Sequence, residues 1–110
     1  MNERTQLIAR LNDLCRTAIG ITGRLAQTDG IRAMSQADQS RIRELVETFD
    51  DFNDANNPHG ERDFGAFDYK ARRVFWKIDY YDKALTYGSD DPSDASRTLR
   101  VLTIMLASEY

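Results

Sequence analysis

Three side chains that could bind a metal ion, His59, Glu61 and Asp63, lie close together in one polar stretch of this sequence. An imidazole and two carboxylates suit a divalent cation, and in an extended chain Glu61 and Asp63 would point to the same side. Asp79 and Asp82 on a neighbouring strand could add oxygen ligands. The stretch lacks the Asp-x-Asp-x-Asp-Gly spacing of a calcium-binding EF-hand loop. A plain turn, with Glu61 paired to a nearby arginine, explains the same residues. The arginines in question are Arg62, Arg72 and Arg73.

A second candidate for chemistry is the alternating series Lys77, Asp79 and Tyr81. A lysine and an aspartate in an aromatic setting could have shifted pKa values and exchange protons as an acid–base pair. The alternative is an ion pair on a partly hydrated sheet. Ser89 and Ser93 have no histidine near them in the sequence, so a nucleophilic triad has no support.

The helices that position these residues follow from apolar spacing. A stripe at helical spacing predicts a helix over 3–18, which Asn2 can begin and Gly20 can end. Its members are Leu7, Leu11, Leu14 and Ala18, with Ile8 and Cys15 beside them. Ser35 and Asp38 resemble a capping box, and the apolar residues after them predict a second helix over 36–50. These residues are Ile42, Leu45, Val46 and Phe49.

Four segments are typical of strands. Residues 22–28 suit a short edge strand, and residues 63–69 and 72–82 suit a hairpin with its turn at Lys70 and Ala71. In the second hairpin strand, one face holds Val74, Trp76, Ile78 and Tyr80, and the other holds Phe75, Lys77, Asp79 and Tyr81. Residues 97–107 are apolar on both faces, which favours a strand inside the sheet. A helix is the alternative there, because Leu99, Leu102 and Leu106 also fit helical spacing.

The sequence thus predicts a single α+β domain over residues 1–110. We expect an antiparallel sheet of about four strands with two helices packed on one face, in the order α-β-α-β-β-β. This arrangement leaves the second face of the sheet to be explained.

Composition limits the partners. The net charge is −3, and it is uneven: residues 49–94 carry −5, whereas residues 1–48 and 95–110 each carry +1. An acidic centre binds phosphate backbones poorly, so we expect no direct contact with nucleic acid. No apolar run is long enough to cross a membrane and the first residues lack a signal-peptide core, so we expect a cytoplasmic protein. Cys15, the only cysteine, allows no internal disulfide; it is expected to be a small buried hydrophobe, with a reactive thiol as the alternative.

Aromatic residues gather in the same acidic centre. Eight lie between residues 64 and 87: Phe64, Phe67, Tyr69, Phe75, Trp76, Tyr80, Tyr81 and Tyr87. About half should enter the core, and the others should lie on the uncovered face, where rings beside carboxylates favour a protein partner. The candidate partner-binding residues are Asp50, Asp51, Asp54, Phe75, Lys77, Asp79, Tyr81, Asp90, Asp91 and Asp94. A second copy of the chain could cover the same face, so a homodimer stays open.

Four phrases carry a resemblance to a known family: FDDFNDANNPHGERDFGAF, FWKIDYYD, GSDDPSD and RTLRVLTIMLASEY. Read in this order, they resemble a small bacterial family catalogued only as a domain of unknown function, common in proteobacteria and often found on plasmids and mobile elements. The resemblance runs from about Leu7 to Tyr110. The family typically has histidine where this chain has Arg62, which weakens a metal or catalytic role at that position. The resemblance implies a shared fold and a genomic setting; it implies no activity.

Three hypotheses follow. The first is a non-enzymatic interaction protein, a mobile-element inhibitor of a CRISPR or restriction complex, which docks its acidic and aromatic surface on a basic partner and needs no cofactor. The second is a small hydrolase that uses a divalent metal at His59, Glu61, Asp63 and Asp79. The third is a toxin-like protein that acts on RNA, which the acidic centre disfavours. Because no catalytic signature spans the acidic centre, the sequence favours a protein without enzymatic activity.

Overall fold

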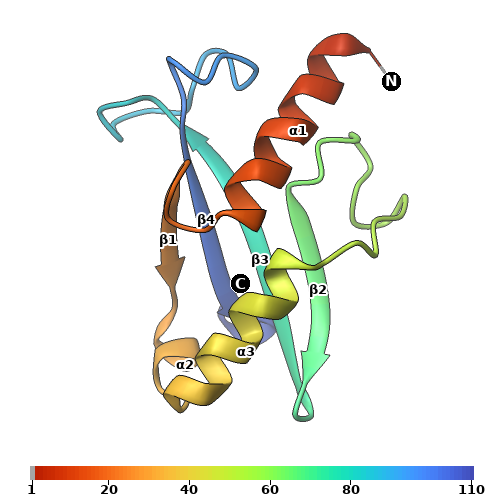
Figure 1. Ribbon diagram of the computed structural model, residues 1–110, viewed down its shortest axis with the longest axis vertical. Coiled ribbons are helices and arrows are strands. Elements are labelled where there is room, and N and C mark those ends of the chain that lie inside the picture. Colours follow the sequence, from red (N-terminus) through yellow and green to blue (C-terminus); the bar gives the residue numbers. More distant parts are fainter. Residues whose placement is uncertain (1) are drawn as a thin grey trace.

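One four-stranded sheet, crossed on a single face by helices, forms the body of the molecule (Figure 1). The computed structural model describes residues 2–110. Its elements are α1 (Glu3–Thr17), β1 (Arg24–Gln27), α2 (Asp29–Arg32), α3 (Gln36–Glu47), β2 (Phe64–Tyr69), β3 (Arg72–Tyr81), β4 (Leu99–Leu106) and the 3-10 turn η1 (Ala107–Glu109). The strands lie in the order β1-β4-β3-β2, so β1 and β2 are the edges. The predicted α+β class is confirmed, and α2 is an additional single turn of helix.

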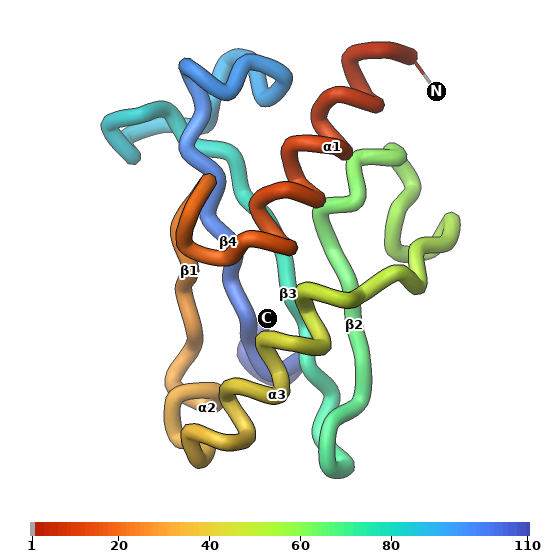
Figure 2. Tube along the Cα trace, viewed as in Figure 1, coloured from red at the N-terminus to blue at the C-terminus, as the bar shows by residue number. Residues whose placement is uncertain are grey.

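The sheet is mixed, so the prediction of a purely antiparallel sheet is wrong. β2 pairs with β3 and β3 with β4 in antiparallel fashion, whereas β1 runs parallel to β4. The reason is the connection through α2 and α3, which carries the chain from one edge of the sheet to the other (Figure 2). A helical crossover returns the chain in its starting direction, so β1 and β2 point the same way, as does β4.

The strands otherwise follow the prediction. Residues 97–107 contain an interior strand rather than a helix, and residues 24–27 form an edge strand. Lys70 and Ala71 form a two-residue hairpin turn and both have positive φ angles, 47° and 64°. Such a turn follows the right-handed twist of the two strands.

Both long helices begin where the sequence predicts. The Asn2 side chain accepts a hydrogen bond from the Thr5 backbone N–H at 2.7 Å, and the Ser35 hydroxyl accepts one from Asp38 N–H at 3.0 Å. A capping box would also have the Asp38 carboxylate accept a hydrogen bond from the Ser35 backbone N–H. Asp38 instead accepts one from the Tyr69 hydroxyl. α3 ends at Glu47, earlier than predicted.

Arg16 explains this early end. Its guanidinium is 3% exposed and donates hydrogen bonds of 2.9–3.0 Å to the carbonyls of Val46, Glu47 and Phe49. The last carbonyls of a helix have no partner within the helix, so a buried arginine satisfies them and completes the helix end. The side of α1 that faces the core therefore includes polar residues. As a result, Leu14 of the predicted apolar stripe is 50% exposed, and the buried positions include Asn12.

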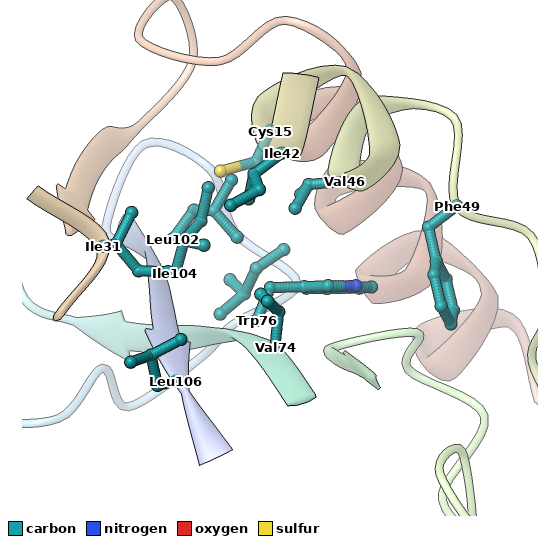
Figure 3. Close-up of a cluster of buried hydrophobic side chains, with 11 residues drawn as sticks. Cys15, Ile31, Ile42, Val46, Phe49, Val74, Trp76, Leu102, Ile104 and Leu106 are labelled. Atoms are coloured by element: carbon teal, nitrogen blue, oxygen red, sulfur yellow. The ribbon is translucent and has the colours of Figure 1, made fainter. Parts of the chain in front are cut away.

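Trp76 lies at the centre of the core between the sheet and the helices (Figure 3). Its indole meets the Phe49 ring edge-on, with the ring centroids 5.5 Å apart. Gly65, opposite Trp76 on β2, leaves the space that the indole fills, since a methyl group there would overlap the ring. The other core side chains come from every layer: Cys15, Ile31, Ile42, Val46, Val74, Ile78, Leu102, Ile104 and Leu106.

Candidate functional site

The face of the sheet opposite α1 and α3 carries all four predicted binding residues of β3. We call this surface the open face. It consists of every second residue of the three long strands, as the strand register gives them: Phe64, Ala66 and Asp68 of β2, Arg73, Phe75, Lys77, Asp79 and Tyr81 of β3, and Leu99, Val101, Thr103 and Met105 of β4. Phe75 and Tyr81 are each only half-buried, which fits a face without a covering helix.

Three rings form a cluster on the open face. Phe64 and Phe75 lie 5.2 Å apart between centroids, and Tyr110 lies 5.7 Å from Phe75 and 6.2 Å from Phe64, each pair close to edge-on. Tyr110 is nevertheless 77% exposed. Rings in this geometry attract one another beyond the area they bury, and the cluster forms a preassembled aromatic patch.

Lys77 and Asp79 form an ion pair on the same face, with Nζ 2.8 Å from Oδ2. The hydrogen bond to Asp79 raises the pKa of Lys77. A lysine held in its charged form cannot act as a base near neutral pH, so the geometry fits the ion-pair interpretation better than proton exchange.

The residues of the candidate metal site lie in two separate surroundings. His59, Asp63 and Asp79 line a hollow of about 370 Å³ beside Lys77. Glu61 instead accepts a hydrogen bond of 2.7 Å from the Tyr80 hydroxyl. The chain is not extended between Glu61 and Asp63, because the intervening residue 62 has a φ angle of 56°. Within residues 2–110, no group of three or more His, Cys, Asp or Glu side chains is arranged to hold a metal ion.

Burial raises the pKa of the Asp63 carboxyl in this hollow.

Arg62, which follows Glu61, pairs with Asp13 of α1 at 2.9 Å and stacks its guanidinium over the Phe52 ring. The expected pairing of Glu61 with an arginine is therefore replaced by one between Glu61 and a tyrosine. These contacts hold the loop before β2 against α1.

A buried polar network beneath this loop was not found from the sequence. Arg100 donates from Nε to Asn12 Oδ1 at 2.7 Å, and Asn12 donates from Nδ2 to the Tyr80 hydroxyl at 2.7 Å. Burial raises the pKa of Tyr80 and lowers that of Arg100. A lone asparagine inside an apolar helical pattern was the available signal. The network joins α1 to β3 and β4, so its evident role is to position these elements.

The two acidic segments of the predicted binding surface differ in their contacts. Asp91 accepts hydrogen bonds from the backbone and hydroxyl of Ser93 and from Arg4, and these bonds lower its pKa. Asp94 accepts from the backbone and hydroxyl of Ser96. These two carboxylates shape their own turns, which is a common use of aspartate. Asp90 is 92% exposed.

Asp50, Asp51 and Asp54 are exposed, and no residue of the described chain donates a hydrogen bond to their carboxylates. Asp50 and Asp51 line a second hollow, of about 360 Å³, between the end of α3 and the edge strand β2. Cys15 does not contribute to any surface: it is 2% exposed and burial raises its pKa, which confirms the prediction of a buried hydrophobe.

The fold defines a class of α+β proteins with one mixed sheet, helices on one face and an open second face. Residues 27–109 match the family described as "Protein of unknown function (DUF3768)", and the chain belongs to that family. No curated protein and no solved structure matches the chain. Among the described residues, no helix has the length and apolar character needed to cross a membrane.

Proposed function

We propose that this chain is a non-enzymatic interaction protein that docks the open face and the neighbouring carboxylates on a basic surface of a partner protein. The observation that carries the proposal is the aromatic cluster of Phe64, Phe75 and Tyr110, which stands on a sheet face without a helical cover. Aromatic residues are enriched at protein interfaces, and tyrosine is among the residues that most often contribute a large share of the binding energy.

The charge of the surroundings sets the chemistry of the partner. Asp50, Asp51 and Asp54 keep their carboxylates free of hydrogen bonds from residues 2–110, so these charges are available to a partner. Because residues 49–94 carry a net charge of −5, attraction to a basic surface would speed association at low salt. Nucleic acid would be repelled by the same charges.

A more specific form of the proposal is an inhibitor of a host defence complex. Its support is the genomic setting typical of the family that the sequence resembles, together with the acidic surface. A CRISPR or restriction nuclease has a basic path for DNA, and a small acidic protein could occupy this path. A metal-dependent hydrolase fits less well, because Glu61 accepts a hydrogen bond from Tyr80 and is not among the residues that line the hollow with His59 and Asp63.

The test is a binding assay with a charge-matched control. The tagged chain is incubated with purified CRISPR and restriction complexes, and nuclease activity and retention are measured at low and high salt. The triple variant Asp50→Lys, Asp51→Lys, Asp54→Lys should lose retention at least about tenfold. The control Glu3→Lys, Asp29→Lys, Glu44→Lys changes the net charge equally on other surfaces and should retain binding.

Two results would contradict the proposal. Equal loss in both triple variants would show that only net charge matters. Absence of any retained partner, with no response in assays of CRISPR interference and restriction, would remove the counter-defence role.

A homodimer through the open face would appear instead as a concentration-dependent mass in sedimentation, abolished by Phe75→Lys.

A further inference from the structure

The outer edge of β2 offers backbone hydrogen-bonding groups that the protein itself does not use. β2 pairs with β3 on one side only and is an edge of the sheet. The Ile78 N–H donates to the Asp63 carbonyl at 2.9 Å, which fixes the alternation of the antiparallel pair. Asp63, Gly65, Phe67 and Tyr69 therefore turn their backbone groups toward β3, and Phe64, Ala66 and Asp68 turn theirs outward.

No residue of the described chain pairs with the outward backbone groups of Ala66 and Asp68. Unpaired edges of this kind bind further strands, and natural proteins usually cover or shorten them. The opposite edge is short, since β1 has four residues, while β2 has six. An added strand could therefore form a longer backbone pairing along β2 than along β1.

A groove with one acidic wall lies beside this edge. Phe49, Asp50 and Asp51 line it on the side of α3, and Ala66 and Phe67 line it on the side of β2. In Figure 2 the chain that leaves α3 passes close to β2, which places the carboxylates next to the edge. Arg73 is the one cationic side chain in the lining, and it already pairs with Asp68 at 3.3 Å.

We infer that the β2 edge binds an extended basic segment of a partner protein as a fifth strand of the sheet. The segment would take its backbone hydrogen bonds from Ala66 and Asp68, and its lysine or arginine side chains would meet Asp50 and Asp51. This is the strand-addition mode of peptide recognition. The inference rests on the proposed function and specifies which part of the partner is held and how.

Charge decides between a foreign segment and a second copy of this chain. Two β2 strands paired edge to edge would bring two sets of Asp50 and Asp51 to one junction. Like charges in such a position oppose association, whereas a basic strand neutralises them. A second copy at this edge is therefore an outcome that the test must be able to detect.

The test uses a synthetic peptide of alternating lysine and valine, acetylated and amidated at its ends, as the basic extended probe. Ala66→Pro removes the outward N–H without touching the bonds to β3, and proline is tolerated at such an edge position. Ala66→Ser keeps the N–H at nearly the same volume and serves as the control. We expect the wild-type and Ala66→Ser proteins to bind alike, and Ala66→Pro to bind about tenfold more weakly.

Amide NMR identifies the mode of binding. On titration, the amide signals of Ala66 and Asp68 should shift and their hydrogen exchange should slow, while a glutamate–valine peptide should have no effect. Equal binding by Ala66→Pro, or shifts confined to β3 and β4 with none in β2, would overturn strand addition. A concentration-dependent shift at Ala66 without peptide would show a second copy at the edge and would also overturn the inference.

The same variants separate this inference from the proposed function. If Ala66→Pro retains a basic protein partner while the Asp50, Asp51 and Asp54 reversal loses it, docking stands and strand addition fails. If the peptide binds at β2 but no protein partner is retained on the open face, strand addition stands and docking of the open face fails. Circular dichroism and thermal unfolding verify that each variant keeps its fold.

Discussion

The two faces of the sheet are made from alternate residues of the same strands, but their side chains differ in how deeply they are buried. On the helix-covered face, Trp76 is fully buried; on the open face, its neighbour Phe75 is only half-buried. The difference does not come from residue type, since both are large aromatics. It comes from α1 and α3, which cover one face only (Figure 1). The covered face should therefore govern stability and the open face binding.

The largest expected difference between the faces is in core packing. Trp76→Ala would remove the ring at the centre of the core and should lower the free energy of unfolding by about 3–5 kcal/mol. Phe75→Ala, one residue away, should cost about 1 kcal/mol, because its ring is already partly hydrated. Urea unfolding followed by circular dichroism measures both. Equal losses would mean that the open face is covered in solution.

The next effect concerns the polar side of the covered face. Arg16→Met removes the donor of the Glu47 and Phe49 carbonyls and leaves the Val46 carbonyl only its backbone contacts, such as the Phe49 N–H at 3.3 Å. We expect a loss of about 2–4 kcal/mol in unfolding free energy and faster hydrogen exchange at the end of α3. Arg10→Met on the exposed side of α1 is the control and should leave both unchanged. A mild effect of Arg16→Met would show that water replaces the guanidinium.

A smaller effect is expected at the glycine that accommodates the central indole. Gly65→Ala places a methyl group against Trp76 on the covered face and should cost about 1–3 kcal/mol. Ala66→Ser, the next residue but on the open face, should change stability by less than about 0.5 kcal/mol. Thermal unfolding compares the two. If Gly65→Ala proves neutral, the indole has room to move.

The smallest effect is a pH dependence at the rim of the sheet. Hydrogen bonds from Tyr69 and Lys70 lower the pKa of Asp38 from 3.8 to about 2. Because the native pKa lies below the unfolded one, this carboxylate stabilises the fold above pH 3.8, and the contribution is lost as the pH falls toward about 2. Tyr69→Phe should return the pKa toward 3.8. NMR titration of the Asp38 carboxyl carbon measures it, and an unchanged midpoint would contradict the hydrogen bond's role.

Local patterns predicted the elements of the fold well. Alternation along residues 72–82 placed Trp76 and Phe75 on opposite faces, and the short turn at Lys70 and Ala71 gave the hairpin. The direction of β1 could not be read from its own residues, because it depends on a partner strand some seventy-five residues further along. The single turn of α2 was likewise too short to leave a periodic signal.

The candidate site was predicted less completely than the fold. The sequence placed Lys77, Asp79 and Tyr81 on one face, and the structure agrees. It did not distinguish two kinds of carboxylate. Those of Asp50 and Asp51 are available to a partner, whereas those of Asp91 and Asp94 accept hydrogen bonds within their own turns. Whether a carboxylate is free depends on which donors the fold brings to it, and these donors include residues as distant as Arg4.

By itself, the sequence determined the kinds of element and the division of each strand into two faces, because periodicity is a local property of the chain. Only the tertiary structure decided which face the helices cover, that Asn12 and Arg16 lie inside, and that β2 ends as an edge with unpaired backbone groups. These outcomes depend on hydrogen-bond partners and packing between distant segments, which no local pattern encodes.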